Sequence, residues 1–332
     1  MTRVLVYSSK PHDREFLPAA PAASALDWQF EPGRLTPDTA RRAAGFDAAC
    51  IFVNDCADAR TLQVLAECGV RLLALRCAGY DQVDLAAARQ LGVAVVRVPA
   101  YSPHAVAEHT VALLMALVRR IPQAHRRVRD FDFSHRNLTG FDLHGKMAGI
   151  VGTGKIGRIV AQILKGFGMC VRATDPFPSE AWARAHGIEY TDFDTLVATS
   201  KVLSLHLPLT AETRNCINAA VLARMPRGSV LVNTGRGGLV ETQALIHALK
   251  LGHLEGAALD VYAGEAGLFF EDHSGKPLPD DQLSLLLNLP NLLLTAHQGF
   301  LTTDALTEIA RVTGENLDRF RAGNSFLDGT LL

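Results

Sequence analysis

Short apolar runs alternate with stretches of helical periodicity along the first hundred residues of the chain. The apolar runs are typical of buried β-strands and lie at residues 4–7, 49–53, 72–75 and 93–96. Residues 59–67 and 85–90 have the pattern of helices, and a glycine soon follows each, as at many helix C-termini. This alternation predicts a parallel sheet with helices on both faces.

A turn framed by two prolines separates this region from the rest of the chain. Pro99 and Pro103 flank the turn, and Ser102 followed by Pro103 is a favourable helix start. A long apolar helix is predicted from there to just before Pro122, and strands and helices alternate again after it. We therefore predict an α/β protein with two doubly wound parallel-sheet domains, and we place the passage between them at this turn.

The composition agrees with two ordinary hydrophobic cores. Of 332 residues, 48% are hydrophobic and 20% are charged. Lys and Arg number 33 against 34 Asp and Glu, and the formal net charge of -1 gives no overall field that attracts nucleic acid or an anionic membrane. We interpret the basic cluster at residues 119–129 as a solvated helix end and expect neither partner.

The cysteines and histidines give no sign of a metal site. Six cysteines are scattered without a Cys-x-x-Cys pair, and no His-Glu-x-x-His spacing occurs. The N-terminus lacks the apolar stretch of a signal peptide, and the longest apolar run, residues 111–118, is far shorter than the roughly 18 residues that span a bilayer. We therefore predict a cytoplasmic protein with reduced thiols and no metal.

A glycine pattern in the middle of the chain is typical of dinucleotide binding. Gly152, Gly154 and Gly157 form a Gly-x-Gly-x-x-Gly motif that follows a predicted strand, opens a predicted helix and precedes a strand ending in Asp175. Gly152 permits a tight turn, Gly154 lets the backbone approach a pyrophosphate, and Gly157 lets the helix pack closely on the sheet. The helix N-terminus offers N–H groups to the phosphates. An ordinary glycine turn, with Asp175 as a helix cap, is the structural alternative.

Asp175 predicts which dinucleotide is bound. It lies where the acid of such a fold accepts hydrogen bonds from the adenosine ribose. A carboxylate repels a 2′-phosphate, and Pro176 and Phe177 follow it rather than arginines that bind one. We therefore expect NAD rather than NADP.

Three later apolar segments each run out into a polar residue. The segments 229–236, 256–265 and 292–297 end at Arg236, Glu265 and His297. Because ligands bind beyond the carboxyl ends of the strands in an open parallel sheet, we expect these side chains to face one crevice with the cofactor.

These three residues have the chemistry needed to reduce a 2-keto acid with a hydride. His297 serves as the acid/base, Glu265 stabilises and orients its ring, and Arg236 anchors the substrate carboxylate through a two-pronged contact. Taken singly, each has a structural alternative: a hydrogen-bonded histidine, a solvated glutamate, a capping arginine. The nucleotide fold favours the joint functional interpretation. His206 is expected to line the nucleotide side of the crevice, and His109 to form hydrogen bonds in the interior or at a hinge.

These motifs, in this order and at this spacing, resemble the D-isomer-specific 2-hydroxyacid dehydrogenases over nearly the whole chain. Further shared segments are residues 233–237, the stretch 260–262 before Glu265, and His297 with Gln298. The resemblance implies that Arg236, Glu265 and His297 are the substrate arginine, the paired glutamate and the acid/base histidine. It also implies cofactor contacts by Lys155, Ile156, Asp175, Leu207, Pro208, Thr213, Thr234, Gly235, Arg236 and Asp260.

Other segments resemble the substrate site of the lactate branch of that family. Residues 75–80 match a loop whose backbone N–H groups at Ala78 and Gly79 receive the carboxylate, and residues 268–272 match the lactate branch. Tyr101 and Phe300 are expected to line the substrate and to set its size, with His297 and Arg236 also in contact. Residues 263–264, Ala and Gly, are smaller than is common there, and we expect them to loosen the loop before Glu265.

The resemblance further implies a discontinuous layout. A Rossmann-type NAD domain, residues 101–298, is inserted into a flavodoxin-like substrate domain of residues 1–100 and 299–332, with hinges near Ala100 and Gln298. Closure about these hinges excludes water from hydride transfer. The chain is also expected to form a homo-oligomer, a dimer or a tetramer.

The expected activity is reversible hydride transfer between NADH and pyruvate, which gives D-lactate. One alternative is a reductase of the same family for a bulkier 2-keto acid. An alternative of another class is a non-catalytic NAD-sensing scaffold, and the retention of all three candidate catalytic residues argues against it. In either enzyme the partner is a small 2-keto or 2-hydroxy acid.

Overall fold

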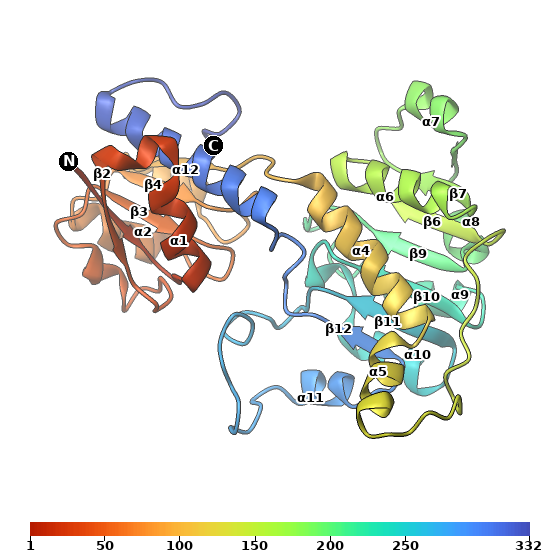
Figure 1. The fold of residues 1–332 in the computed structure, drawn as a ribbon. Coiled ribbons are helices and arrows are strands. Elements are labelled where there is room, and N and C mark those ends of the chain that lie inside the picture. The colour runs from red at the N-terminus through yellow and green to blue at the C-terminus, as the bar shows by residue number, and fades with distance from the viewer. The chain divides into compact units, whose positions relative to one another are not determined.

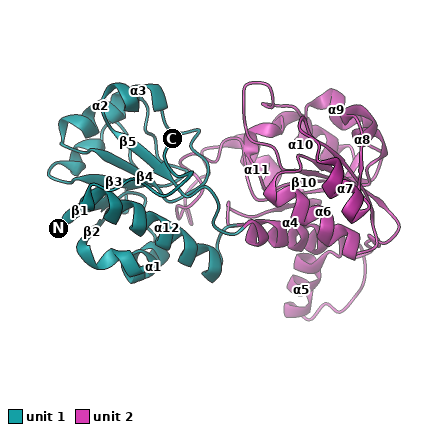
Figure 2. Ribbon diagram, turned by 90° about the horizontal axis from the view of Figure 1, so that it is seen from above, with its two compact units in different colours: residues 1–102, 300–332 teal, residues 103–299 magenta.

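A computed structural model describes residues 1–332. The chain divides into two compact units, shown in different colours in Figure 2. Unit 1 comprises Met1–Ser102 and Phe300–Leu332, and unit 2 comprises Pro103–Gly299. None of the helices has the length and the apolar character needed to cross a bilayer.

Unit 1 is built on a parallel sheet of five strands in the order β2-β1-β3-β4-β5. This order is that of flavodoxin-like folds. Its strands are β1 (Thr2–Val6), β2 (Leu26–Phe30), β3 (Ala48–Ile51), β4 (Leu72–Leu75) and β5 (Ala94–Arg97). Its helices are α1 (Pro11–Ala19), α2 (Ala59–Glu67), α3 (Leu85–Gln90) and α12 (Thr303–Ala322), with short 3₁₀ turns at Pro21–Ala25 and Ala40–Ala43.

The C-terminal segment completes unit 1. Helix α12 packs against α1 and β4, and its buried residues Ala310 and Leu317 share a hydrophobic core with Val4 and Val6 of β1. Beyond α12 the chain pairs with β5, where the Arg97 N–H donates to the Thr330 carbonyl at 2.9 Å. The unit therefore consists of two segments that are far apart in the sequence.

Unit 2 is built on a parallel sheet of seven strands in the order β12-β11-β10-β9-β6-β7-β8 (Figure 1). The strands are β6 (Met147–Val151), β7 (Cys170–Thr174), β8 (Glu189–Tyr190), β9 (Val202–Leu205), β10 (Ser229–Asn233), β11 (Leu254–Leu259) and β12 (Leu292–Leu294). The chain starts at β6, adds β7 and β8 on one side and then continues from β9 on the other. This is the Rossmann order, with its switch point between β6 and β9, so the predicted fold class is confirmed.

Helices cover both faces of the second sheet. They are α4 (Pro103–Val118), α5 (Ile121–Arg129), α6 (Lys155–Gly166), α7 (Glu180–His186), α8 (Phe193–Thr199), α9 (Ala219–Arg224), α10 (Thr242–Lys250) and α11 (Asp281–Leu287), with a 3₁₀ turn at Gly237–Leu239. In β10, Val230 and Val232 pack with α4 and α6, while Leu231 packs with α9 and α10. Because successive side chains point to opposite faces, a strand buried on both faces is apolar throughout.

The ends of the predicted strands 4–7, 49–53 and 93–96 are shifted by one or two residues in the structure, and the predicted elements differ from it more strongly in three places. The pattern did not reveal β2, an edge strand whose mixed residues are largely half-buried, or the short helix α1. The basic cluster forms a separate helix, α5, because Arg120 adopts a left-handed conformation at φ +54° that ends the run of α4. The helix at 59–67 and the strand at 72–75 have the predicted bounds.

Candidate active site

The glycine turn between β6 and α6 fits tightly into unit 2. Gly152 has φ +94°, and an added Cβ would lie 2.7 Å from the carbonyl oxygen of His206. A Cβ on Gly157 would lie 2.0 Å from the carbonyl oxygen of Gly152. Both positions therefore require glycine for the turn and for the close packing of α6 on the sheet.

The N-terminus of α6 is open, as a dinucleotide requires. Gly154 is the N-cap residue, and a Cβ there would meet no atom within 4 Å. Lys155 and Gly154 are exposed, whereas Ile156 packs against the hydrophobic core beneath. Free N–H groups and the positive end of this 12-residue helix suit a pyrophosphate. The residues at this turn therefore fit NAD.

Asp175 follows β7 and is bonded to the glycine turn itself. Its Oδ2 accepts from the backbone N–H of Thr153 at 2.6 Å and from the Thr153 hydroxyl at 3.0 Å, and its Oδ1 accepts from the Phe177 N–H at 2.8 Å. Partial burial opposes ionisation, but these hydrogen bonds outweigh it and hold the pKa of Asp175 below its ordinary value. The side chain is thus an anion at neutral pH, partly exposed beside the turn.

We expect Asp175→Ala to narrow the preference for NADH over NADPH by roughly tenfold or more, because the carboxylate no longer repels a 2′-phosphate. Asp175→Asn is the matched variant, since it keeps an acceptor for Thr153 and removes only the charge. The measurement is kcat/KM with each cofactor. Equal use of both cofactors by the unmodified protein would contradict the assignment.

The predicted cofactor residues after β9 are held by local hydrogen bonds. Desolvation lowers the pKa of His206 to about 4, so its ring is neutral at pH 7, and Nε2 lies 2.9 Å from the Ser204 hydroxyl. Leu207 lies against the Gly152 turn, and Pro208 is exposed. The Thr213 hydroxyl donates to the Pro208 carbonyl at 2.7 Å and thereby closes the loop. Their contacts with the cofactor stay predictions.

Arg236 lies in a tight turn after β10. The Asn233 side chain accepts from the Gly235 N–H at 3.1 Å and donates to the Arg236 carbonyl at 2.9 Å, which fixes this turn. The Thr234 hydroxyl points into the protein, where it lies 2.7 Å from the Thr110 hydroxyl of α4. A Cβ on Gly237 would lie 2.0 Å from the carbonyl carbon of Tyr262, so the Arg236 turn packs directly on the segment before Glu265.

Glu265 and His297 come together although 32 residues separate them. The Nδ1 atom of His297 lies 2.8 Å from Oε1 of Glu265, and both side chains are partly exposed. The other carboxylate oxygen, Oε2, accepts from the Tyr262 N–H at 3.0 Å. The ring of Phe270 lies 5.8 Å from that of His297. The predicted imidazole–carboxylate pair is therefore present in the fold.

Asp260 is buried and holds the loop that carries His297. Its carboxylate accepts from the Gln298 and Gly299 N–H groups at 2.9 and 2.8 Å and from Thr295, and it bonds to Nε2 of His109 at 3.2 Å. Burial opposes ionisation, but these hydrogen bonds prevail and lower the pKa of Asp260. His297 has φ +53°, a rare conformation that this anchoring maintains. His109 is thus an interior hydrogen bonder, as predicted.

Unit 1 carries the predicted carboxylate loop after β4. The carbonyl of Ala78 accepts from Arg97 at 2.9 Å and that of Gly79 from the Cys77 thiol at 3.3 Å, whereas neither N–H group donates to a protein acceptor. Before the loop, Arg76 is buried and paired with Asp13 at 2.9 Å. This arrangement fixes the loop and leaves its N–H groups for a ligand.

An aromatic pair lies in the same unit. Phe300 is buried, and its ring is 5.3 Å from that of Phe52, which in turn lies under the Arg76 guanidinium at 5.0 Å. Sequence reasoning named Phe300 and the half-buried Tyr101 but missed Phe52. Its position directly after β3, at a carboxyl strand end, was the available signal.

Comparison with known proteins decides the family. A family model described as "D-isomer specific 2-hydroxyacid dehydrogenase, NAD binding domain" matches residues 111–299. D-lactate dehydrogenase of Escherichia coli (strain K12) is 46% identical over 323 residues, which cover 97% of this chain and 98% of that protein. The chain belongs to the D-isomer-specific 2-hydroxyacid dehydrogenases.

Two further similarities extend over nearly the whole of this D-2-hydroxyacid dehydrogenase. D-lactate dehydrogenase kk1H of Curvularia clavata is 45% identical over 325 residues, covering 97% of this chain and 93% of that protein. A solved structure described as the pyruvate reductase of Chlamydomonas reinhardtii superposes with a TM-score of 0.91 at 43% identity and covers 98% of both chains. The protein is therefore an NAD-dependent dehydrogenase of small 2-hydroxy acids.

Proposed function

We propose that this D-2-hydroxyacid dehydrogenase is a D-lactate dehydrogenase that interconverts pyruvate and D-lactate. The observation that carries the proposal is the 2.8 Å contact between His297 Nδ1 and Glu265 Oε1 at the carboxyl edge of the dinucleotide-binding sheet. Relatives named D-lactate dehydrogenase and a neighbour described as a pyruvate reductase support the choice of substrate.

In this proposal, residues of unit 2 transfer the proton and bind the substrate carboxylate. When bound, NADH supplies the hydride that reduces the keto carbon. His297 gives its Nε2 proton to the carbonyl oxygen, because Nδ1 is held by Glu265, and it takes the proton back in the reverse direction. Arg236 binds the carboxylate with two parallel hydrogen bonds. The net reaction is pyruvate, NADH and one proton to D-lactate and NAD⁺.

Unit 1, residues 1–102 and 300–332, supplies the remaining substrate contacts in this proposal. The free N–H groups of Ala78 and Gly79 receive the carboxylate. The rings of Phe52 and Phe300 lie 5.3 Å apart. Together with Tyr101 they limit the space for the substrate side chain and so favour the methyl group of pyruvate. Unit 2, residues 103–299, binds the dinucleotide.

A panel of 2-keto acids with increasing side-chain size tests the substrate. We expect the highest kcat/KM for pyruvate with NADH, measured from NADH absorbance. A higher value for a branched or aromatic 2-keto acid would identify a reductase of bulkier acids. Binding of NADH without turnover of any 2-keto acid would support the NAD-sensing scaffold instead.

Replacing Glu265 with glutamine tests the pairing with the proton donor. The negative charge of the Glu265 carboxylate stabilises the protonated imidazole ring beside it. In Glu265→Gln this stabilisation is lost, so we expect the proton to leave at lower pH. The basic limb of kcat/KM for pyruvate reduction then moves toward acid, while the dissociation constant of NADH is unchanged. A basic limb at the same pH in both proteins would show that Glu265 is not coupled to the donor.

A homo-oligomer completes the proposal. Ile121, Val128, Phe131 and Phe133, on α5 and just after it, are 55%, 52%, 83% and 69% exposed, which is unusual for large apolar side chains gathered in one short segment. We assign this surface to a second copy of the chain. Sedimentation velocity measures the association, and a monomer at all concentrations would contradict it.

We also assign the enzyme to the cytoplasm. All six cysteines are free thiols, and two of them, Cys50 and Cys77, are buried. Reduced thiols of this kind are typical of a reducing compartment. Cell fractionation with an activity assay tests the location.

A further inference from the structure

A single side-chain hydrogen bond closes the long loop between β11 and α11. The Tyr262 hydroxyl donates to Oδ2 of Asp280 at 2.8 Å, and Oδ1 of Asp280 accepts from the Leu283 N–H at 2.9 Å as the N-cap of α11. Tyr262 is the third residue after β11 and is 5% exposed. The two ends of the loop, residues 263–279, are therefore tied to the sheet and to a helix.

This loop carries two groups that contact His297. Glu265 bonds to the imidazole at 2.8 Å, and the ring of Phe270 packs against it at 5.8 Å. Phe270 has φ +69°, a conformation that is unfavourable for an aromatic residue and persists only when the surroundings hold it. The neighbouring Phe269 packs on the Tyr262 ring at 6.5 Å.

Gly264 makes the contact between Tyr262 and Asp280 possible. An added Cβ there would lie 2.7 Å from Cε1 of Tyr262 and 2.9 Å from Oδ2 of Asp280. The small pair at residues 263–264 was expected to loosen the loop. That expectation stays a prediction; in the structure the missing side chain gives the tyrosine ring room to reach the carboxylate.

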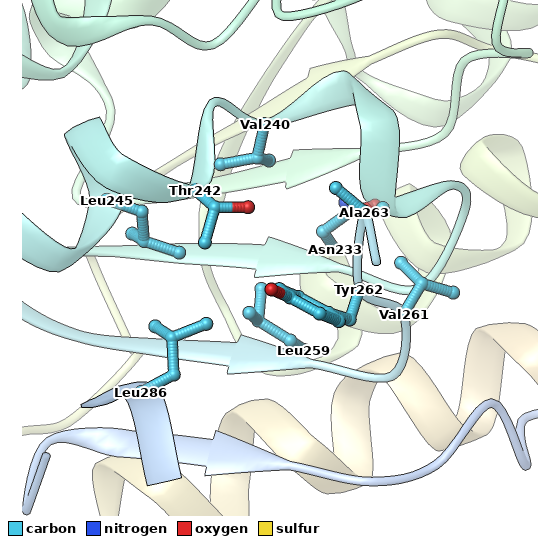
Figure 3. Close-up of a pocket in the computed structure, with 10 residues that line it drawn as sticks. Asn233, Val240, Thr242, Leu245, Leu259, Val261, Tyr262, Ala263 and Leu286 are labelled. Carbon is cyan, nitrogen blue, oxygen red and sulfur yellow. The ribbon is translucent and has the colours of Figure 1, made fainter. Parts of the chain in front are cut away.

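The Tyr262 hydroxyl is a permanent donor to Asp280. The ring lies beside Leu259 in a small cavity with room for roughly one water molecule (Figure 3). The other side chains of this cavity carry no titratable group: Asn233, Val240, Thr242, Leu245, Leu259, Val261, Ala263 and Leu286. Burial, together with the hydrogen bond to Asp280 and its negative charge, raises the pKa of Tyr262, so the proton stays on the hydroxyl.

We propose that Tyr262 and Asp280 are positioning residues for proton transfer. Their hydrogen bond fixes the Tyr262 backbone, whose N–H holds Oε2 of Glu265 at 3.0 Å and thereby keeps Oε1 on Nδ1 of His297. The inference rests on the proposed function, because it assigns the purpose of this arrangement to the acid/base histidine. It adds an outer pair to the Glu265–His297 pair.

The test uses the full-length enzyme with three single variants and a matched control. Tyr262→Phe removes only the hydroxyl, and Asp280→Asn keeps an oxygen for the Leu283 N–H but loses the carboxylate. Gly264→Ala crowds the same contact without changing either partner. Asp281→Asn, an exposed carboxylate at the next position, is the control for charge. Each protein is assayed for kcat/KM with pyruvate across pH, for NADH binding by fluorescence, and for Tm.

We expect the three variants to lose roughly three- to tenfold in kcat/KM, the worth of about one hydrogen bond. Their basic limbs move toward acid, in the same direction as that of Glu265→Gln but less far. NADH binding stays the same, and Asp281→Asn resembles the unmodified enzyme. In a Glu265→Gln background, Tyr262→Phe produces no further shift, since both changes act on the same carboxylate.

Two outcomes would overturn the inference. One is an unchanged basic limb in Tyr262→Phe, even with a lower Tm, because the hydrogen bond then has only a structural role. The other is a shift of full size in the Glu265→Gln background, because Tyr262 then acts by another route. If Glu265→Gln itself leaves the limb unchanged, the pairing in the proposed function fails first, so the two failures are distinguishable.

Discussion

We expect His297→Gln to lower kcat for pyruvate reduction by roughly 10²–10⁴, the usual contribution of a positioned acid/base group. The imidazole is the proton donor in the proposed mechanism, and glutamine cannot transfer a proton at neutral pH. The Glu265 carboxylate then has no ring to orient. Steady-state kinetics with NADH and pyruvate measure the loss, and fluorescence titration checks that NADH still binds.

The backbone at this position calls for a second variant. His297 has φ +53°, and asparagine adopts such a conformation more readily than glutamine does. We therefore expect His297→Asn to lose as much activity as His297→Gln. If the asparagine variant kept most of the activity, the loss in the glutamine variant would come from the displaced loop rather than from the imidazole.

Arg236→Lys is expected to lower kcat/KM for pyruvate by roughly 10- to 100-fold. A lysine ammonium cannot reproduce the two parallel hydrogen bonds of a guanidinium with a carboxylate, and each bond to a charged group is worth about 1.5–3 kcal/mol. KM rises and kcat falls together, because the carboxylate sets both the affinity and the orientation of the carbonyl. Initial rates over a range of pyruvate concentrations measure both constants.

The NADH dissociation constant is the control for this variant. The Arg236 turn is fixed by Asn233 through the backbone, so lysine keeps the turn and the adjoining cofactor residues. Unchanged pyruvate kinetics would show that Arg236 has no part in binding the substrate, and a large loss of NADH affinity would place it on the cofactor instead.

Hydrogen bonds to buried or half-buried side chains explain how the fold supports this chemistry. The Asp260 carboxylate accepts hydrogen bonds from the Gln298 and Gly299 N–H groups and bonds to His109. It therefore holds the loop that carries His297 in place. Asp175 does the same for the glycine turn through Thr153. Both carboxylates were predicted to contact the cofactor, and in the structure both also stabilise the neighbouring backbone through hydrogen bonds.

The sequence by itself determined the features that depend on neighbouring residues. The periodicity of residues 59–67, 85–90 and 72–75 located two helices and a strand with the observed bounds, since the burial of one face imposes a fixed repeat. The glycine spacing at 152–157 required a tight turn before a helix, because only glycine tolerates the backbone of Gly152 and the packing of Gly157.

Composition and pattern were weaker guides where one element has both exposed and buried parts. The edge strand β2 and the helix α1 contain mixed polar and apolar residues, so neither gives a clear repeat. The end of α4 before Pro122 was predicted, but the start of the separate helix α5 was not; the left-handed conformation of Arg120 between the two helices could not be read from its residue type.

The pairing of Glu265 with His297 was predicted from their chemistry and is present in the fold. Only the tertiary structure decided the other polar pairs, Asp260 with His109 and Tyr262 with Asp280, which are separated by 151 and 18 residues. They bond because adjacent parallel strands and the helices on them bring their ends together. The type of a residue determines which hydrogen bonds its side chain is able to form. Which partner it finds depends on strand order and on packing, and these follow from the burial of the whole sheet rather than from any local segment.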